Sequence, residues 1–96
     1  GVSGVIKLIV VAGMFIQSQD SRLDILVVGN NIKKSQLESA IKAIESELGK
    51  ELRYAVFDTQ EFKYRRGIYD RLIRDVFDYP HQIILDKIGI ESESKN

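Results

Sequence analysis

Hydrophobic residues dominate two stretches near the start of the chain. Residues 5–16 are nearly all apolar and predict a buried strand with a bend at Gly13. After a polar turn at residues 17–21, residues 23–28 predict a second buried strand, which residues 29–31 end. The short connection favours an antiparallel hairpin between the two strands.

A helical period follows the second strand. Ser35 and Glu38 have the spacing of a capping box, which predicts a helix with Ser35 at the N-cap. The apolar residues of this helix share one face: Leu37, Ala40, Ile41, Ile44 and Leu48. Gly49 is the expected stop. Residues 52–57 then predict a third strand, and the intervening helix implies a right-handed parallel crossover.

The second half of the chain predicts two more helices. Asp58 and Glu61 form another capping box, which opens a short helix to about residue 66. A further helix carries an apolar stripe expected in the core: Tyr69, Leu72, Ile73, Val76 and Phe77. Pro80 ends it, because the residue before proline avoids the helical region. Residues 82–88 are either a fourth strand or a final turn.

These elements predict an α/β (α+β) fold with a small mixed sheet, in the chain order β-β-α-β-α-α-β. We expect the helices mainly on one face of the sheet and the strand order 1-2-3. The 96 residues suffice for one domain, over residues 2–90, with a polar tail at 91–96. The early start on a core strand suggests a C-terminal domain excised from a longer protein.

Composition narrows the classes of function. The 14 basic residues cancel the 14 acidic ones, so the global charge favours neither nucleic acid nor an anionic membrane as a partner. Cysteine is absent and His81 is the single histidine, which excludes thiolate metal sites and disfavours a histidine zinc site. The longest apolar run, residues 8–12, is too short to cross a membrane. We therefore expect a cytoplasmic protein with no membrane partner.

Asp24 interrupts the apolar run of the second predicted strand. A buried charge is costly unless it is paired, so Asp24 either meets a cation or opens onto a site. A structural ion pair with Arg22 or Arg53 is the simplest expectation. Arg22 and Arg53 could instead bind an anion together, because guanidinium groups suit phosphate.

The segments Val11-Ala12-Gly13-Met14 and Ser21-Arg22-Leu23-Asp24-Ile25-Leu26-Val27-Val28-Gly29 resemble a known family. With the helix and third strand that follow, they resemble the minimal nucleotidyltransferase fold of the polymerase-beta superfamily. Residues 54–62 and 69–75 look like the subgroup fused behind winged-helix domains in transcriptional regulators. The resemblance implies a Gly-Ser turn that holds phosphates. It also implies three carboxylates that hold two Mg²⁺ ions for nucleotide transfer.

The chain departs from that pattern at several positions. Gly13 is kept, but Met14 replaces the serine, Arg22 replaces the first aspartate, and Arg53 stands where the third carboxylate belongs. Only Asp24 remains, and a guanidinium cannot ligate Mg²⁺. A plain hairpin is also expected in place of the family's helical, phosphate-facing turn between the first two strands.

These departures predict a domain that has lost catalysis and acts as a ligand-binding or assembly module of a transcriptional regulator. The expected ligand-binding residues are Gly13, Met14, Arg22, Asp24 and Arg53. The expected partners are a nucleotide or other small anion and a second copy of the chain, with no cofactor. The alternative is an active, divergent Mg²⁺-dependent nucleotidyltransferase, in which Asp24 holds one metal together with Glu51 or Asp20.

Three further features have simple structural explanations. The basic cluster at residues 63–66 could touch nucleic-acid phosphates, but we expect a solvated face paired with nearby acids. His81 is expected to be structural, since no serine or cysteine motif accompanies it. Phe15 and Ile16 either protrude as an apolar patch for a partner or fold inward against the hairpin.

Overall fold

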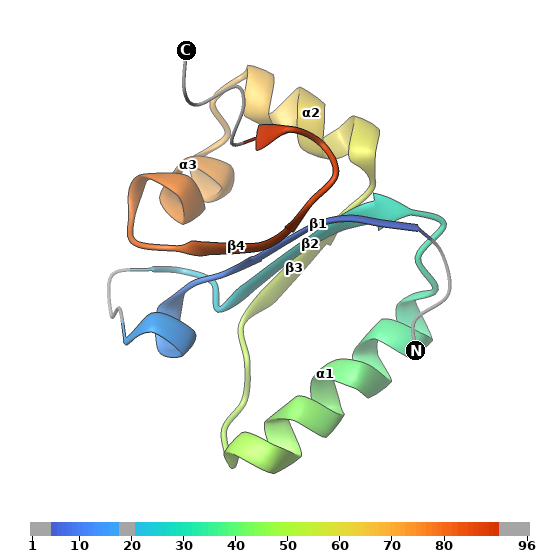
Figure 1. Cartoon of the computed structure of the whole chain (residues 1–96), viewed down its shortest axis with the longest axis vertical. Coiled ribbons are helices and arrows are strands. Elements are labelled where there is room, and N and C mark those ends of the chain that lie inside the picture. The colour runs from blue at the N-terminus through green and yellow to red at the C-terminus, as the bar shows by residue number, and fades with distance from the viewer. Residues whose placement is uncertain (1–4, 18–20, 91–96) are drawn as a thin grey trace.

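The computed structural model describes residues 5–17 and 21–90. Its elements are β1 (Val5–Val11), the 3-10 helix η1 (Gly13–Ile16), β2 (Ile25–Asn30), α1 (Lys34–Leu48), β3 (Tyr54–Phe57), α2 (Thr59–Gly67), α3 (Arg71–Asp78) and β4 (Gln82–Asp86) (Figure 1). The expected polar tail at residues 91–96 and the acid Asp20 lie outside the described residues.

The four strands form one mixed sheet in the order β3-β2-β1-β4. β1 pairs antiparallel with both β2 and β4, whereas β2 and β3 are parallel. The antiparallel first pair, the parallel crossover partner and the neighbour order 1-2-3 are therefore confirmed. Of the two alternatives for residues 82–88, the strand is correct, and it pairs with the free side of β1.

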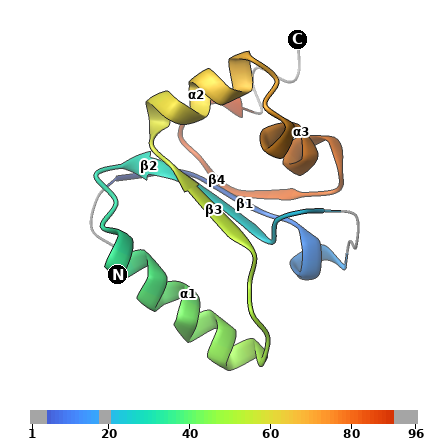
Figure 2. The ribbon, with the colours of Figure 1, turned by 180° about the vertical axis from the view of Figure 1, so that it is seen from behind.

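The helices lie on both faces of the sheet, so the expectation of helices mainly on one face is wrong. Figures 1 and 2 show α1 on one side and both α2 and α3 on the other. The cause lies in β2, whose residues 25–28 are all buried. Because successive strand residues point to opposite faces, a strand buried at every position needs cover on both sides.

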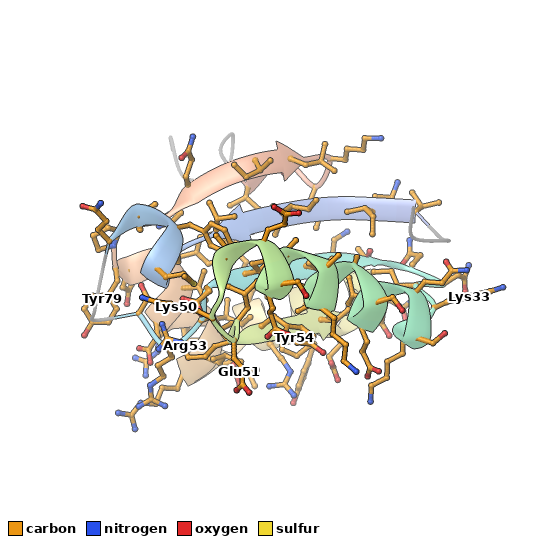
Figure 3. All side chains as sticks on the ribbon, turned by 90° about the horizontal axis from the view of Figure 1, so that it is seen from below. Lys33, Lys50, Glu51, Arg53, Tyr54 and Tyr79 are labelled. Atoms are coloured by element: carbon orange, nitrogen blue, oxygen red, sulfur yellow. The ribbon has the colours of Figure 1, made fainter. Side chains whose placement is uncertain are left out.

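Two hydrophobic clusters result, one on each face. The cluster on the α2–α3 side contains Leu8, Val10, Leu23, Leu26, Val28, Phe57, Phe62, Ile73, Val76 and Ile90. The cluster on the α1 side contains Ile25, Val27, Leu37, Ile41 and Leu52. The view from the α1 side shows α1 lying over β2 and β3, with β1 and β4 emerging beside it (Figure 3). The second cluster is therefore the smaller of the two.

Two predicted boundaries near the sheet are wrong for physical reasons. β1 ends at Val11, and a turn of 3-10 helix replaces the rest of the expected strand and the plain hairpin. Gly29 and Asn30 belong to β2 instead of ending it. A Cβ on Gly29 would collide with the carbonyl oxygen of Val5, so this glycine lets β1 approach closely.

The start of α1 also differs from the prediction. Its N-cap is Lys33, not Ser35, and the N–H of Leu37 donates to the carbonyl of Lys33 at 3.1 Å. Ile32 and Leu37, at positions N′ and N4, both pack in the cluster on the α1 side, as a hydrophobic staple requires. Packing therefore sets the first turn and leaves Ser35 inside the helix. Gly49, in the left-handed region at φ 71°, ends α1 as expected.

The later helices follow their sequence signals more closely. The predicted N-cap at Asp58 is confirmed, because its Oδ1 accepts the N–H of Glu61 at 2.7 Å. Asp70 caps α3 by accepting the N–H groups of Leu72 and Ile73. Tyr69 is not a core residue: it precedes that cap, has φ 55° and is 75% exposed.

Candidate functional site

Four of the five predicted site residues meet at one end of the sheet. Gly13 and Met14 follow β1, Asp24 immediately precedes β2, and Arg53 immediately precedes β3. The pairings of Ile25 with Val11 and with Tyr54 bring these three chain segments side by side. Figure 3 shows Arg53 at the end of the molecule opposite Lys33.

The carboxylate of Asp24 is held by four N–H donors. Its Oδ1 accepts the backbone N–H of Met14 at 2.9 Å and Nη2 of Arg53 at 3.0 Å. Its Oδ2 accepts the backbone N–H of Arg53 at 2.8 Å and Nε of the same residue at 3.2 Å. We call this arrangement of Asp24, Arg53 and the Met14 backbone the Asp24 clamp.

Arg53 links the clamp to the preceding loop as well. Its Nη1 donates to the carbonyl oxygen of Ser21 at 2.9 Å, so all three guanidinium nitrogens make hydrogen bonds. The backbones also pair, with the N–H of Asp24 donating to the carbonyl of Arg53 at 2.7 Å. The expected structural ion pair of Asp24 is thus formed with Arg53.

The two side chains of the clamp differ in exposure. The Asp24 side chain is 3% exposed, whereas that of Arg53 is 52% exposed. Burial by itself raises the pKa of the Asp24 carboxyl. The hydrogen bonds from the side chain and backbone of Arg53 and from the Met14 backbone, with the charge of Arg53, outweigh it and leave that pKa below its ordinary value. Asp24 is therefore ionised at neutral pH.

Gly13 makes the clamp sterically possible. Its φ of +52° lies in the left-handed region. A Cβ there would collide with Oδ1 of Asp24 and would lie 2.8 Å from the carbonyl oxygen of Leu23 and 2.9 Å from Nη2 of Arg53. Glycine is therefore required for the carboxylate to reach the Met14 N–H.

Arg22, the fifth predicted site residue, has a different partner. Its Nε lies 2.8 Å from Oδ2 of Asp75 on α3, and this ion pair fastens the loop before β2 to the helix. Each of the two arginines is therefore paired with its own carboxylate. The joint anion site formed by Arg22 and Arg53 is not preformed in this arrangement.

The remaining sequence candidates have mostly structural surroundings. Arg65 of the basic cluster lies 3.2 Å from Asp70, 3.8 Å from Glu61 and 4.7 Å from the centre of the Phe57 ring. His81 packs edge-on against Phe77 at 5.2 Å, and its Nδ1 lies 2.9 Å from the carbonyl oxygen of Tyr79. Phe15 is exposed and Ile16 is half-buried.

Sequence reasoning missed the backbone contribution to the site. Two of the four donors to Asp24 are main-chain N–H groups, of Met14 and Arg53, which no side-chain pattern encodes. It also missed Asp75 as the partner of Arg22, because the two lie far apart in the chain. The signal available in the sequence was the combination of Gly13, in the turn after the first strand, with Asp24, an isolated carboxylate at the start of the second strand.

Comparison with protein-family models, with curated proteins and with solved structures gives no match to this chain. The function must therefore be argued from the geometry and chemistry described above. Among the described residues, no helix is long and apolar enough to cross a bilayer, and no cluster of three or more histidine, cysteine, aspartate or glutamate side chains is found.

Proposed function

We propose that this chain is a nucleotidyltransferase-like domain without transfer activity, which serves as an assembly module in a cytoplasmic transcriptional regulator. The placement of Gly13, Asp24 and Arg53 supports the likeness. They lie at adjoining ends of three neighbouring strands, where the family resemblance puts its phosphate turn and two of its carboxylates. In this proposal, the contacts to DNA come from another domain.

One observation carries the loss of catalysis: the carboxylate of Asp24 already has four N–H donors. A carboxylate offers about four lone-pair directions, so a metal ion would have to displace a donor. Arg53 would also repel the ion. At roughly 4 Å and an effective dielectric near 20, the repulsion between a dication and a guanidinium is about 8 kcal/mol. The clamp thus opposes metal binding through both geometry and charge.

The test is a transfer assay on the purified chain with Mg²⁺ or Mn²⁺ and each radiolabelled nucleoside triphosphate. We expect no transfer above that of a buffer control, and no heat in calorimetric titration with Mg²⁺-ATP. The Glu51→Gln variant addresses the active alternative, because Glu51 is exposed and we expect its substitution to leave the fold intact. Metal-dependent transfer that disappears in Glu51→Gln would establish the divergent enzyme instead.

The assembly role is supported by the edge formed by β3. This edge strand, Tyr-Ala-Val-Phe, is only four residues long, but it has no charge, proline or bulge, which are among the usual protections against edge pairing. The other edge strand, β4, has a bulge and an aspartate. Lys34 and Glu38 of α1 lie beside β3 and line one hollow with Tyr54 and Val56. A second copy of the chain, related by a twofold axis, could pair along β3 with each lysine facing the partner's glutamate.

Light scattering on the intact chain tests this assembly. We expect a dimer mass that Lys34→Glu or Glu38→Lys shifts toward monomer, because each change places like charges together. The double exchange restores the opposite charges and should restore the dimer. Lys42→Glu, on the same helix but outside that hollow, is the control and should leave the mass unchanged. Monomer mass for the unmodified chain at all concentrations would contradict the assembly role.

A further inference from the structure

A groove lies away from the Asp24 clamp, among α2, α3 and β4. Its cavity volume is about 320 Å³, and residues that line it include Arg66, Tyr69, Ile73, Arg74, Phe77 and His81. A second hollow, lined by Lys63, Gly67 and Ile88, shares Arg66 and Tyr69 with the first. We call the two together the α3 groove. No residue of the Asp24 clamp lines it.

The floor of the α3 groove is apolar. Ile73 and Ile90 are buried there, and the half-buried side chains of Phe77 and Ile83 complete the surface. His81 stands against Phe77. Since the carbonyl of Tyr79 can only accept a hydrogen bond, Nδ1 of His81 is the donor and Nε2 is an acceptor in the neutral ring. The volume and the floor suit one planar ring with a polar edge.

The rim of the α3 groove is positively charged, although the whole chain has no net charge. Lys63, Arg66 and Arg74 line it, with Asp78 as the opposing acid. Lys63 and Arg66 come from α2, whereas Arg74 comes from α3, so the cations stand on two sides of the opening. Such an arrangement favours a ligand with two negative charges, because guanidinium and ammonium groups both bind phosphate.

Tyr69 connects the two hollows. It occupies a left-handed backbone conformation, which costs an aromatic residue about 1–2 kcal/mol and which glycine would adopt without strain. Its side chain is nonetheless largely exposed and lines both hollows. An exposed ring at the mouth of an apolar groove is suited to stack on a planar ligand.

From these features, we propose that the α3 groove binds a small aromatic phosphate of the mononucleotide type. The ring would lie over Phe77 beside Tyr69, and the phosphate would lie among Lys63, Arg66 and Arg74. This inference goes beyond the proposed function and does not rest on it, since it uses neither a metal nor Asp24. It assigns a role to Lys63 and Arg66 of the basic cluster, which lie outside the Asp24 clamp.

The experiment is a titration of the isotopically labelled, intact chain with adenosine 5′-monophosphate, followed by NMR in the presence of EDTA. We expect saturable shift changes confined to residues 63–90. Adenosine and inorganic phosphate, as separate probes, should each bind about tenfold more weakly or worse, because each lacks half of the interactions. Binding that persists in EDTA would show that the α3 groove needs no divalent metal ion, and would separate this result from any metal-dependent transfer activity.

Matched variants locate the site. Arg74→Ala should weaken binding about tenfold, whereas Arg71→Ala, an exposed arginine on the same helix that does not line the groove, should leave it within about twofold. Tyr69→Gly removes the ring while relieving the backbone, so weaker binding without loss of stability would support stacking. Absence of saturable shifts up to about 10 mM ligand would overturn the proposal. So would shifts centred on Gly13 and Arg53, or much tighter binding of a single-stranded oligonucleotide that both arginine variants weaken equally.

Discussion

Gly13 has no side chain at the point where the carboxylate of Asp24 approaches the backbone, and the two residues depend on each other. A Cβ on Gly13 would collide with Oδ1, and without the carboxylate the N–H of Met14 would lose its acceptor. The pair explains why a single aspartate can sit at the start of an otherwise apolar strand.

Replacing Gly13 should therefore be the most damaging of three glycine-to-alanine changes. We expect Gly13→Ala to lower the free energy of unfolding by about 3 kcal/mol or more, through both the collision and the positive φ. Gly49→Ala, which has φ +71° but open space around its Cβ, should cost about 1 kcal/mol. Gly67→Ala has neither problem and should be neutral or slightly stabilising. Urea unfolding measures all three, and equal losses at positions 13 and 49 would contradict the steric account.

Removing the charge of Asp24 should destabilise the fold strongly. Asp24→Asn keeps the shape but replaces one acceptor oxygen by an NH2 group, whose two N–H donors face N–H donors of Arg53 or Met14. We therefore expect a loss of about 3 kcal/mol. Asp58→Ala is the comparison, because it removes an exposed N-cap and should cost about 1 kcal/mol. Chemical denaturation of both variants provides the measurement. A loss at Asp24 no larger than at Asp58 would show that the clamp contributes little.

The clamp should also make stability depend on pH in the acid range. The folded-state pKa of Asp24 is lowered from 3.8, so the unfolded chain takes up this proton first as the pH falls. The contribution is complete above about pH 5 and is lost as the pH drops through the ordinary value toward the lower folded one. The difference in unfolding free energy between the natural chain and Asp24→Asn should therefore shrink below pH 4. A difference that stays constant down to pH 2 would contradict the lowered pKa.

The ion pair of Arg22 with Asp75 should contribute much less. The Arg22 side chain is about half exposed, and solvent screens such pairs, so a double-mutant cycle with Arg22→Ala and Asp75→Ala should give a coupling energy of about 1 kcal/mol or less. Raising the salt concentration should reduce it further. A coupling near 3 kcal/mol would place this pair on the same footing as the Asp24 clamp.

The sequence predicted the sheet better than the layers around it. Apolar runs and turn residues located the strands, and the helix between β2 and β3 indicated their parallel pairing. The uninterrupted apolar run at residues 25–28 was also visible in the sequence. It indicated helices on both faces of the sheet, but the prediction placed them mainly on one face. Successive side chains of a strand point to opposite faces, so an unbroken run of Leu, Ile and Val places apolar side chains on both faces of the sheet.

Local signals failed where tertiary packing competed with them. The serine and glutamate at positions 35 and 38 fit a capping box, yet Ile32 and Leu37 fix the start of α1 two residues earlier. For the site, residue types predicted that Asp24 pairs with either Arg22 or Arg53, and the family resemblance grouped Gly13 with them. They could not identify the backbone donors or the 3-10 turn, because both depend on how β1, β2 and β3 align.

The Asp24 clamp has a consequence for folding kinetics. Asp24 and Arg53 are 29 residues apart, and the whole of α1 lies between them, so the clamp can close only after the crossover has docked. Contacts that form after the rate-limiting step mainly slow unfolding. The clamp should therefore form after the folding transition state. Asp24→Asn would accelerate unfolding while leaving the refolding rate nearly unchanged.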